Sequence, residues 1–474
     1  MRRTLIFTLS LLLAGAKTAS AQDTKWKAHL SYYEPTEIEE APGNMLYILA
    51  SQGLYSYDRD DQSLQTYDKV STLSDCGIAH IAWCQAAKRL VIVYENHNID
   101  LLSPNSDVVN ITDYMNKSMT EDKTVNSVYI SGSYAYLSTA FGVIKLDVAS
   151  AAIIDTYKLG FNVDYSYISE GYLYAAGSTQ GLCRAPLTSN LLDKSNWTRV
   201  GDYVANPKTM DADLLALVKT LSPGGPKYNN FGFLRFINNK LYTCSGVGEK
   251  LSATPQVYDG DRWTIYDESF VATLGHRYVG SFSLDVDPTN PNHVAVGGQT
   301  GVYEFVNGQL LKAWSNDNSE LQTAKLVGNN DKDYVLATAV KYDADGNLWV
   351  ANSQSPDRSL LKLSAGQWSY YDHSELMSLD GYSMETMKNM IFDSNNQLWF
   401  VNDYHHTTAL VCYRPATNTV KRYSTFTNED GTSYTVTNVR FVAEDKDKNI
   451  WMGTTVGPFY LTPDDITSGS EIFT

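Results

Sequence analysis

Several features that would place this sequence in a common functional class are scarce or missing. The 474 residues hold 37 Lys and Arg against 53 Asp and Glu. The net charge of −16 argues against the basic face that nucleic acids and anionic membranes require. The five cysteines include no C-x-x-C pair, which argues against a thiolate zinc site. No serine-hydrolase elbow, zinc-protease motif, phosphate-binding loop or dinucleotide fingerprint occurs. We therefore expect no catalytic, cofactor-binding or metal-binding residues.

The N-terminus has the pattern of a secretory signal peptide over residues 1–21. Two arginines precede a short apolar stretch at 5–14, and Ala19-Ser20-Ala21 forms a small-residue cleavage site before Gln22. The apolar stretch is too short to span a bilayer, and no cysteine follows it to carry a lipid. We expect an exported chain, in the periplasm or at the outer-membrane surface, that does not span the membrane.

The odd number of cysteines restricts disulfide bonding, since at least one must stay unpaired. Cys76 and Cys84 are near enough in sequence to bridge neighbouring strands, but buried free thiols are the favoured interpretation. The five are Cys76, Cys84, Cys183, Cys244 and Cys412.

A repeated pattern is clearest in the last third of the chain. Each copy is an apolar strand, a polar turn, and a second strand that carries a tryptophan, which is typical of a β-hairpin. The copies lie about fifty residues apart, at 343–350, 393–400 and 445–452. We interpret the regularly spaced Trp and Tyr residues as packing between repeats, not as a binding site.

Weaker copies precede these three. Their second strands fall near 44–48, 88–92, 133–137, 171–174, 239–242 and 293–296. One copy can be divided completely, into strands at 125–130, 134–139, 143–147 and 153–157. Four antiparallel strands per repeat predict an all-β fold, a β-propeller of four-stranded antiparallel blades, with one complete seven-bladed-type ring and part of a second.

Glycines recur between the second and third strands, where we expect backbone angles that other residues resist. They are Gly53, Gly142, Gly181, Gly301 and Gly457. A further strand near 29–32 would close the first ring against its last blade.

The repeats predict three parts of the chain. The signal peptide at 1–21 precedes an N-terminal propeller at 22–320, which has an insertion at about 185–235. A partial second propeller, apparently truncated, follows at 321–474. The insertion has a helical pattern over 210–219, ended by a Pro-Gly-Gly-Pro run. It either builds a binding face or is merely a tolerated loop.

The opening of the chain resembles a known family. The residues concerned are 26–32, 53–58, 73–75, 98–102, 122–126 and 134–143, and their order and spacing hold as well as their types. They are similar to the N-terminal propeller domain of PorZ-like accessory proteins of the Bacteroidetes type IX secretion system, over roughly 22–205. The late Trp copies resemble two-component-regulator propeller repeats.

The resemblance implies an exported, non-enzymatic protein that works at the cell surface with a sortase-like PorU-type partner. Such proteins carry two propellers and a C-terminal immunoglobulin-like sorting domain. We expect this sequence to depart from that plan, with its residues ending inside the second propeller. The resemblance implies no catalytic residues and no cofactor for this sequence.

Two other features have residue types found in metal or ligand sites. The Asp-rich turns at 343–347 and 445–449 lack the closing Glu of a calcium loop, so hairpin turns are the better interpretation. The cluster at 403–406 contains two adjacent histidines but would need a third ligand from another repeat to hold a metal. Tyr, Trp and Asn on propeller loops could stack on sugar rings, so a surface polysaccharide is a possible partner.

Three functions compete on this basis. The favoured one is an accessory or scaffold of the type IX secretion system, acting through protein and surface-glycan contacts. The alternative is the periplasmic glycan-sensing propeller region of a hybrid two-component regulator. An enzyme, such as a propeller lyase, would need a convergent set of carboxylates or His and Tyr at the ring centre.

Overall fold

The computed structural model describes residues 26–246, 248, 250–327 and 331–474, so the predicted signal peptide lies outside the described residues. The described chain is almost entirely β, as predicted, with four-stranded antiparallel sheets following one another along the sequence. It divides into two compact units, Met1–Pro223 and Gly224–Thr474. No helix among the described residues combines the length and the apolar character that a membrane crossing needs.

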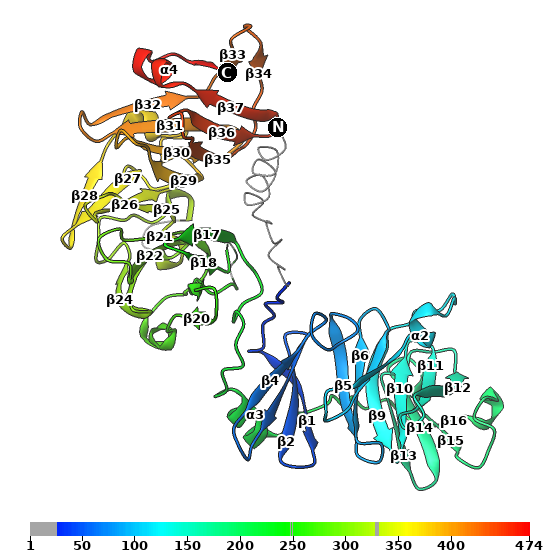
Figure 1. The fold of residues 1–474 in the computed structure, drawn as a ribbon. Coiled ribbons are helices and arrows are strands. Elements are labelled where there is room, and N and C mark those ends of the chain that lie inside the picture. Colours follow the sequence, from blue (N-terminus) through cyan, green and yellow to red (C-terminus); the bar gives the residue numbers. More distant parts are fainter. Residues whose placement is uncertain (1–25, 247, 249, 328–330) are drawn as a thin grey trace, which may run out of the picture. The chain divides into compact units, whose positions relative to one another are not determined.

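The described residues of the first unit form four sheets, each an antiparallel meander (Figure 1). They are β1 (Pro35–Ala41), β2 (Met45–Ala50), β3 (Gly53–Asp58) and β4 (Leu64–Tyr67); β5 (Ile78–Cys84), β6 (Arg89–Tyr94), β7 (Ile99–Leu102) and β8 (Val108–Ile111); β9 (Val125–Ser131), β10 (Tyr134–Thr139), β11 (Gly142–Asp147) and β12 (Ala152–Lys158); and β13 (Tyr165–Ser169), β14 (Tyr172–Gly177), β15 (Gly181–Pro186) and β16 (Thr198–Gly201). The helical segments of this unit are α2 (Asp113–Asn116), η1 (Lys194–Asn196) and α3 (Ala212–Val218).

The second unit continues the same pattern. Its four-stranded sheets are β17 (Phe233–Ile237), β18 (Lys240–Cys244), β19 (Gln256–Tyr258) and β20 (Trp263–Ile265); β21 (Ser281–Val286), β22 (His293–Gly298), β23 (Gly301–Val306) and β24 (Gln309–Trp314); β25 (Ala337–Tyr342), β26 (Leu348–Asn352), β27 (Leu360–Ser364) and β28 (Gln367–Tyr371); and β29 (Met387–Phe392), β30 (Leu398–Asn402), β31 (Ala409–Arg414) and β32 (Thr419–Tyr423).

Two three-stranded sheets complete this unit. One holds β35 (Val439–Glu444), β36 (Ile450–Thr454) and β37 (Gly457–Leu461), and the other holds β33 (Phe426–Asn428), β34 (Ser433–Tyr434) and β38 (Ile472–Phe473). The helical segments are η2 (Ser269–Thr273), η3 (Lys325–Val327), η4 (Lys332–Tyr334), η5 (Ser374–Leu376) and α4 (Pro463–Ser468).

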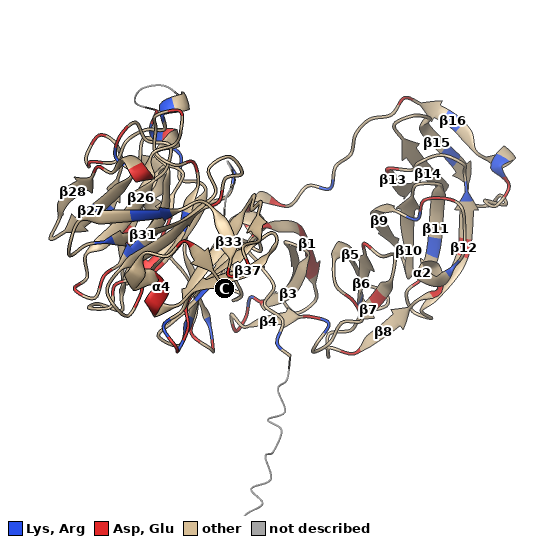
Figure 2. Ribbon diagram, turned by 90° about the horizontal axis from the view of Figure 1, so that it is seen from above, with Lys and Arg blue, Asp and Glu red and all other residues tan. Residues whose placement is uncertain are grey.

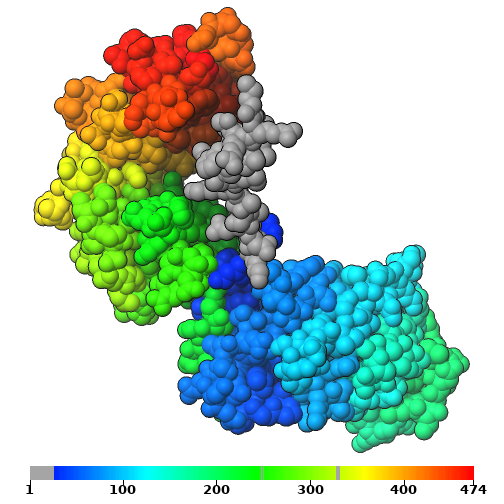
Figure 3. Space-filling view, in the orientation of Figure 1, coloured from blue at the N-terminus to red at the C-terminus, as the bar shows by residue number. Residues whose placement is uncertain are grey.

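The sheets pack face to face as propeller blades do. In the first unit the first strands β1, β5, β9 and β13 are neighbours, so these strands form the inner side of an arc (Figure 2). The four sheets follow one another in chain order, as the colour bands of Figure 3 show. Between consecutive sheets lie apolar cores, such as the one formed by Val91, Val93, Leu137 and Ile144. Burial of these facing layers is the main stabilising contribution to such a fold.

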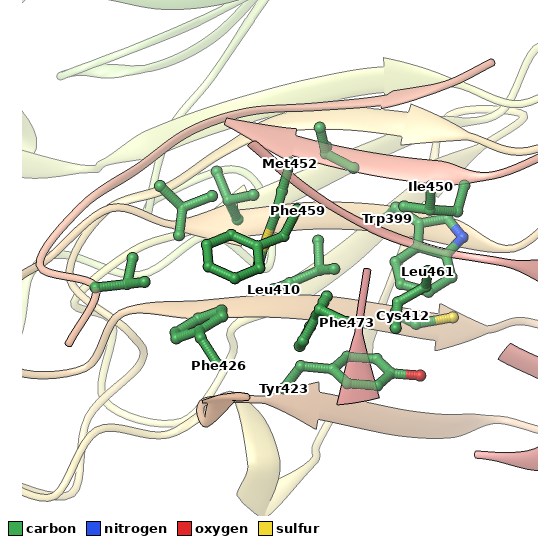
Figure 4. Packing of buried hydrophobic residues seen from close by; sticks show 14 of the residues in the cluster. Trp399, Leu410, Cys412, Tyr423, Phe426, Ile450, Met452, Phe459, Leu461 and Phe473 are labelled. Carbon is green, nitrogen blue, oxygen red and sulfur yellow. The ribbon is translucent and has the colours of Figure 1, made fainter. Parts of the chain in front are cut away.

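The core at the end of the second unit shows how a shorter sheet is completed. Trp399, Tyr423 and Phe426 meet Met452, Phe459 and Phe473 in one buried cluster (Figure 4). Phe473 comes from β38, which pairs in parallel with β33. The last strand of the described chain therefore covers apolar side chains of the neighbouring sheets.

The glycine prediction is confirmed at four of the five positions. Gly142 has a φ of +154°, and a Cβ there would lie 2.0 Å from the Tyr157 carbonyl oxygen. Gly53 differs, because its φ is not positive. At Gly53 the ring of Tyr32 lies where a side chain would be, 2.8 Å from the Cβ position. The requirement at Gly53 is therefore close packing, not an unusual backbone angle.

The expected strand near 29–32 is wrong. These residues have no regular secondary structure. Tyr32 is instead buried against the edge of Tyr55, with ring centroids 5.9 Å apart. Helix α3 packs against the apolar cluster that contains Tyr32 and Tyr55, through Leu214, Leu217 and Val218. A helix and an irregular segment thus cover the outer face of the first sheet.

The helix predicted at 210–219 is confirmed as α3, and its N-cap Asp211 accepts bonds from the amides of Asp213 and Leu214. The segment expected as an insertion at 185–235 also supplies β16, the outer strand of the fourth sheet. The division at 223 differs from the expected boundary at 320, and the assignment of sheets to a first and a second ring stays a prediction.

All five cysteines are free, so the Cys76–Cys84 bridge does not form. Cys84, Cys244 and Cys412 are buried, as the favoured interpretation required, whereas Cys183 is half-buried and Cys76 is exposed.

Candidate functional site

A pocket of about 600 Å³ lies on the inner side of the first unit. The first strand of each sheet contributes to its lining, through residues such as His80, Asn126 and Tyr167. The rest of the lining comes from the segment 202–211 between β16 and α3, which we call the strap. Figure 2 shows this connection running across the concave side of the arc.

One wall of the pocket is lined with tyrosines. Tyr165 and Tyr167 alternate along β13 and therefore face the same side of the sheet. Tyr165 stacks on Tyr167 at 6.2 Å, and Tyr167 stacks on Tyr174 of β14 at 4.6 Å with nearly parallel rings. Tyr203 of the strap approaches Tyr165 at 6.3 Å. Partial burial raises the pKa of Tyr165, Tyr167 and Tyr203, so their hydroxyls stay protonated.

The opposite wall is acidic and carries one lysine of the strap. The Lys208 ammonium lies 3.1 Å from Glu37 Oε2 and 2.7 Å from Glu39 Oε1, and it donates to the Ile81 carbonyl at 3.0 Å. Glu37 also contacts His80 Nδ1 at 2.9 Å and accepts the Ile81 amide at 2.8 Å.

These contacts determine the charge states of Glu37 and Lys208. Burial alone would raise the pKa of Glu37, but the bond to His80, the charge of Lys208 and the Ile81 amide outweigh burial and lower it. Burial would likewise lower the pKa of Lys208, but Glu39 and Glu37 raise it. Both groups are therefore ionised at neutral pH.

The side chains of this pocket offer ring stacking and hydrogen bonding. Both nitrogens of His80 are engaged, Nδ1 with Glu37 and Nε2 with the Val125 carbonyl at 3.1 Å. His80 is thus committed to structural contacts and is not placed beside a hydroxyl as the base of a nucleophilic pair would be.

The histidine pair and the Asp-rich turns noted in the sequence lie outside this pocket. His405 and His406 are exposed, and the neighbouring Asp403 forms ion pairs with Lys388 and Arg440. Within the described part of the chain no group of three or more metal-ligating side chains gathers. The Asp-rich turns at 343–347 and 445–449 join paired antiparallel strands, as predicted.

A smaller polar centre lies in the second unit. His293 contacts Asp287 Oδ2 at 3.1 Å through Nδ1 and Glu304 Oε1 at 3.0 Å through Nε2. The indole of Trp314 donates to the other oxygen of Glu304, and the Tyr342 hydroxyl lies 3.3 Å from His293 Nε2. The bond to Glu304 is the main reason that the pKa of His293 is raised.

Sequence reasoning did not find the pocket of the first unit. Glu37 and Lys208 are 171 residues apart, and nothing local marks either as a partner of the other. The alternation of Tyr165 and Tyr167 was a usable signal, because two tyrosines on one face of an inner strand point to a polar aromatic surface.

Comparison with known proteins gives one family match. Residues 46–198 match the model of the type IX secretion PorZ N-terminal β-propeller domain. The search of curated proteins finds no match. Among solved structures, PorZ of Porphyromonas gingivalis superposes with a TM-score of 0.76 at 20% identity, covering 95% of this chain and 74% of that one. That PorZ is an essential bacterial surface component of the type-IX secretion system.

Other matches are weaker. The extracellular domain of a putative one-component system from B. thetaiotaomicron gives a TM-score of 0.32 at 13% identity, covering 90% of this chain and 65% of that one. That of a putative hybrid two-component system from the same organism gives 0.27 at 11% identity, over 94% and 77%. The resemblance to the PorZ N-terminal propeller domain is thus confirmed over residues 46–198, and the likeness of fold extends over nearly the whole described chain.

Proposed function

We propose that this protein is an exported, non-catalytic accessory of the type IX secretion system that acts at the cell surface as a scaffold. Its partners are a sortase-like PorU-type protein and a surface polysaccharide. The observation that carries this proposal is the family match over residues 46–198. The agreement of fold with PorZ over 95% of the chain supports it.

The tyrosine-lined pocket supports a polysaccharide contact. Tyrosine offers a flat apolar ring together with a hydroxyl, and this combination suits a ligand that is apolar on its faces and polar at its edges. The rings of Tyr165, Tyr167 and Tyr174 form a continuous stack that leads from the pocket along the fourth sheet. Arg184 extends this surface, with its guanidinium 4.1 Å from the Tyr172 ring centroid.

The binding test uses the full chain from Gln22 and polysaccharide purified from the surface of the source bacterium. We expect Tyr165→Ala to weaken binding about tenfold, which corresponds to the loss of one stacking ring. Tyr434→Ala is the matched control, because Tyr434 is an exposed tyrosine of the second unit, far from the pocket in sequence. Equal binding by the two variants would contradict the assignment of the pocket.

The protein partner is tested by co-purification. Tagged chain isolated from the source bacterium should retain the PorU-type sortase, and an unrelated exported propeller with the same tag should not. Recovery of the sortase in equal amounts with both baits would argue against a specific scaffold.

A further inference from the structure

The strap is held across the pocket by side-chain contacts, which include an ion pair between Asp202 and Arg199 and the approach of the Tyr203 ring to Tyr165. Within the described residues it forms no strand, and Val204 is 70% exposed. The Tyr165 hydroxyl donates to the Val204 carbonyl at 2.8 Å. At the other end, the Lys208 ammonium is bound by Glu37, Glu39 and the Ile81 carbonyl. A segment anchored by side-chain contacts and not by strand pairing exchanges more easily for another of the same kind than a paired strand does.

The receptor for the lysine is ordered by contacts that do not involve the strap. Glu37 is fixed by His80 and by the Ile81 amide. Glu39 accepts the Trp83 amide at 2.9 Å. The two carboxylates and the Ile81 carbonyl therefore keep their places when the lysine leaves, and a preorganised site costs little to fill again.

We propose that the acidic inner face of β1 and β5 is a docking site for an extended, lysine-bearing segment of a partner protein. The strap occupies this site in the isolated chain as a built-in competitor. This inference goes beyond the proposed function, because it concerns the acidic wall of the pocket and a different class of ligand.

The geometry specifies the ligand. Three oxygen acceptors at 2.7–3.1 Å match the three N–H donors of an ammonium group. A planar guanidinium fits such a converging set less well, because its donors are arranged to match the two oxygens of a single carboxylate. The bound carbonyl lies four residues before the lysine, and an extended chain covers about 13 Å over that interval. The partner segment should therefore be extended, with its lysine four residues after a carbonyl that Tyr165 can reach.

Charge complementarity supports a protein ligand with a basic residue. With Lys208 withdrawn, the carboxylates of Glu37 and Glu39 lose their shared cation, and one histidine, His80, lies between Glu37 and the β9 backbone. A cation restores the balance, and an anionic or neutral polymer does not.

The test uses a synthetic peptide with the sequence of strap residues 203–210, blocked at both ends so that its lysine is its one amine. A carbodiimide joins lysines to carboxylates that they contact. We expect the full-length Lys208→Ala chain to be joined to the peptide at Glu37 or Glu39. By fluorescence anisotropy it should bind the peptide about tenfold more tightly than the wild-type chain, in which the tethered strap competes at high effective concentration.

Three controls make the result decisive. Lys158→Ala removes an exposed ion pair with Glu121 in the same unit and should bind like the wild type. Lys208→Ala/Glu39→Gln should lose the gain, while circular dichroism shows that it keeps the β fold. A peptide of the same composition in scrambled order should bind less.

Binding of the peptide equally to wild type and Lys208→Ala would overturn the proposal. It would also be overturned if the peptide bound neither chain, or if cross-links fell on other carboxylates. None of these measurements involves polysaccharide, so they are independent of the test of the proposed function.

Discussion

At the scale of single residues, the late repeats owe their turns to one aspartate each. In the 393–399 turn, Asp393 Oδ1 accepts the amides of Asn395 and Gln397, and Oδ2 accepts the Trp399 indole at 2.9 Å. Asp343 and Asp445 make the same bonds at the corresponding positions. The sequence pattern indicated a hairpin and a packed tryptophan, and the structure adds the carboxylate that joins them. The pKa of Asp445 falls to about 2, mainly because of the bond from Trp451.

Asp393→Ala should lower the stability of the second unit by about 2–3 kcal/mol, since it removes a charged acceptor and leaves a buried indole N–H without a partner. Asp393→Asn keeps an oxygen for the indole and should cost less than half as much. Thermal unfolding of the two variants measures the difference. Equal losses would contradict the role assigned to the carboxylate.

The turn of the sixth sheet uses a histidine in a similar place. The Asp287 amide donates to the His293 carbonyl at 3.0 Å, as the Asp343 amide does to that of Asn347 at 2.9 Å. The side chain of His293 then binds Asp287 and Glu304 together. The presence of a histidine in this turn makes the stability of the turn sensitive to pH.

The sign of that sensitivity follows from the two shifts. The pKa of His293 is raised, so its contribution is complete below its unfolded value of about 6.5 and is lost as pH rises through the folded value. The pKa of Asp287 is lowered by bonds from Thr289 and His293 despite burial, so its contribution is lost on acidification. We expect the melting temperature of the wild type to fall above about pH 6.5 relative to that of His293→Asn. His406→Asn, which alters an exposed histidine, should follow the wild type, and parallel profiles for all three would refute the prediction.

At the scale of elements, the strands were the most predictable part of the molecule. Strands 125–130, 134–139, 143–147 and 153–157 correspond to β9–β12 within one or two residues, because alternation and turn residues are local signals. The segment at 29–32 was mistaken for a strand because apolar and aromatic residues there serve packing instead. Tyr32 covers the first sheet without pairing with it.

Glycine at the second turn of a sheet provides a test at this scale. Gly142→Ala places a Cβ 2.0 Å from the Tyr157 carbonyl oxygen, so the β11–β12 pairing must shift. Gly132 in the same sheet also has a positive φ, of +60°, but nothing lies within 4 Å of its Cβ position. We expect Gly132→Ala to cost about 1 kcal/mol and Gly142→Ala roughly 3 kcal/mol or more, measured by denaturant unfolding. Similar losses would mean that backbone angle alone, not the close approach, requires glycine at 142.

At the scale of the whole molecule, the fold class could be expected from sequence, but the binding surfaces could not. Repeat spacing predicted blades, and the residues at 26–143 pointed to the family whose model matches 46–198. The pocket depends on Glu37 and Lys208 meeting across an arc of four sheets, and that meeting is a property of the completed fold. The same limit applies to His293 and Glu304, whose separate positions in two strands carried no sign of a shared site.

The central claim is that this protein serves type IX secretion, and deleting its gene in the source bacterium tests that claim most directly. The measurement is the fraction of type IX cargo that reaches the cell surface, compared with the fraction retained inside. We predict that cargo accumulates inside the deletion strain and that the wild-type gene, supplied in trans, restores surface delivery. Normal delivery of cargo in the deletion strain would contradict the account.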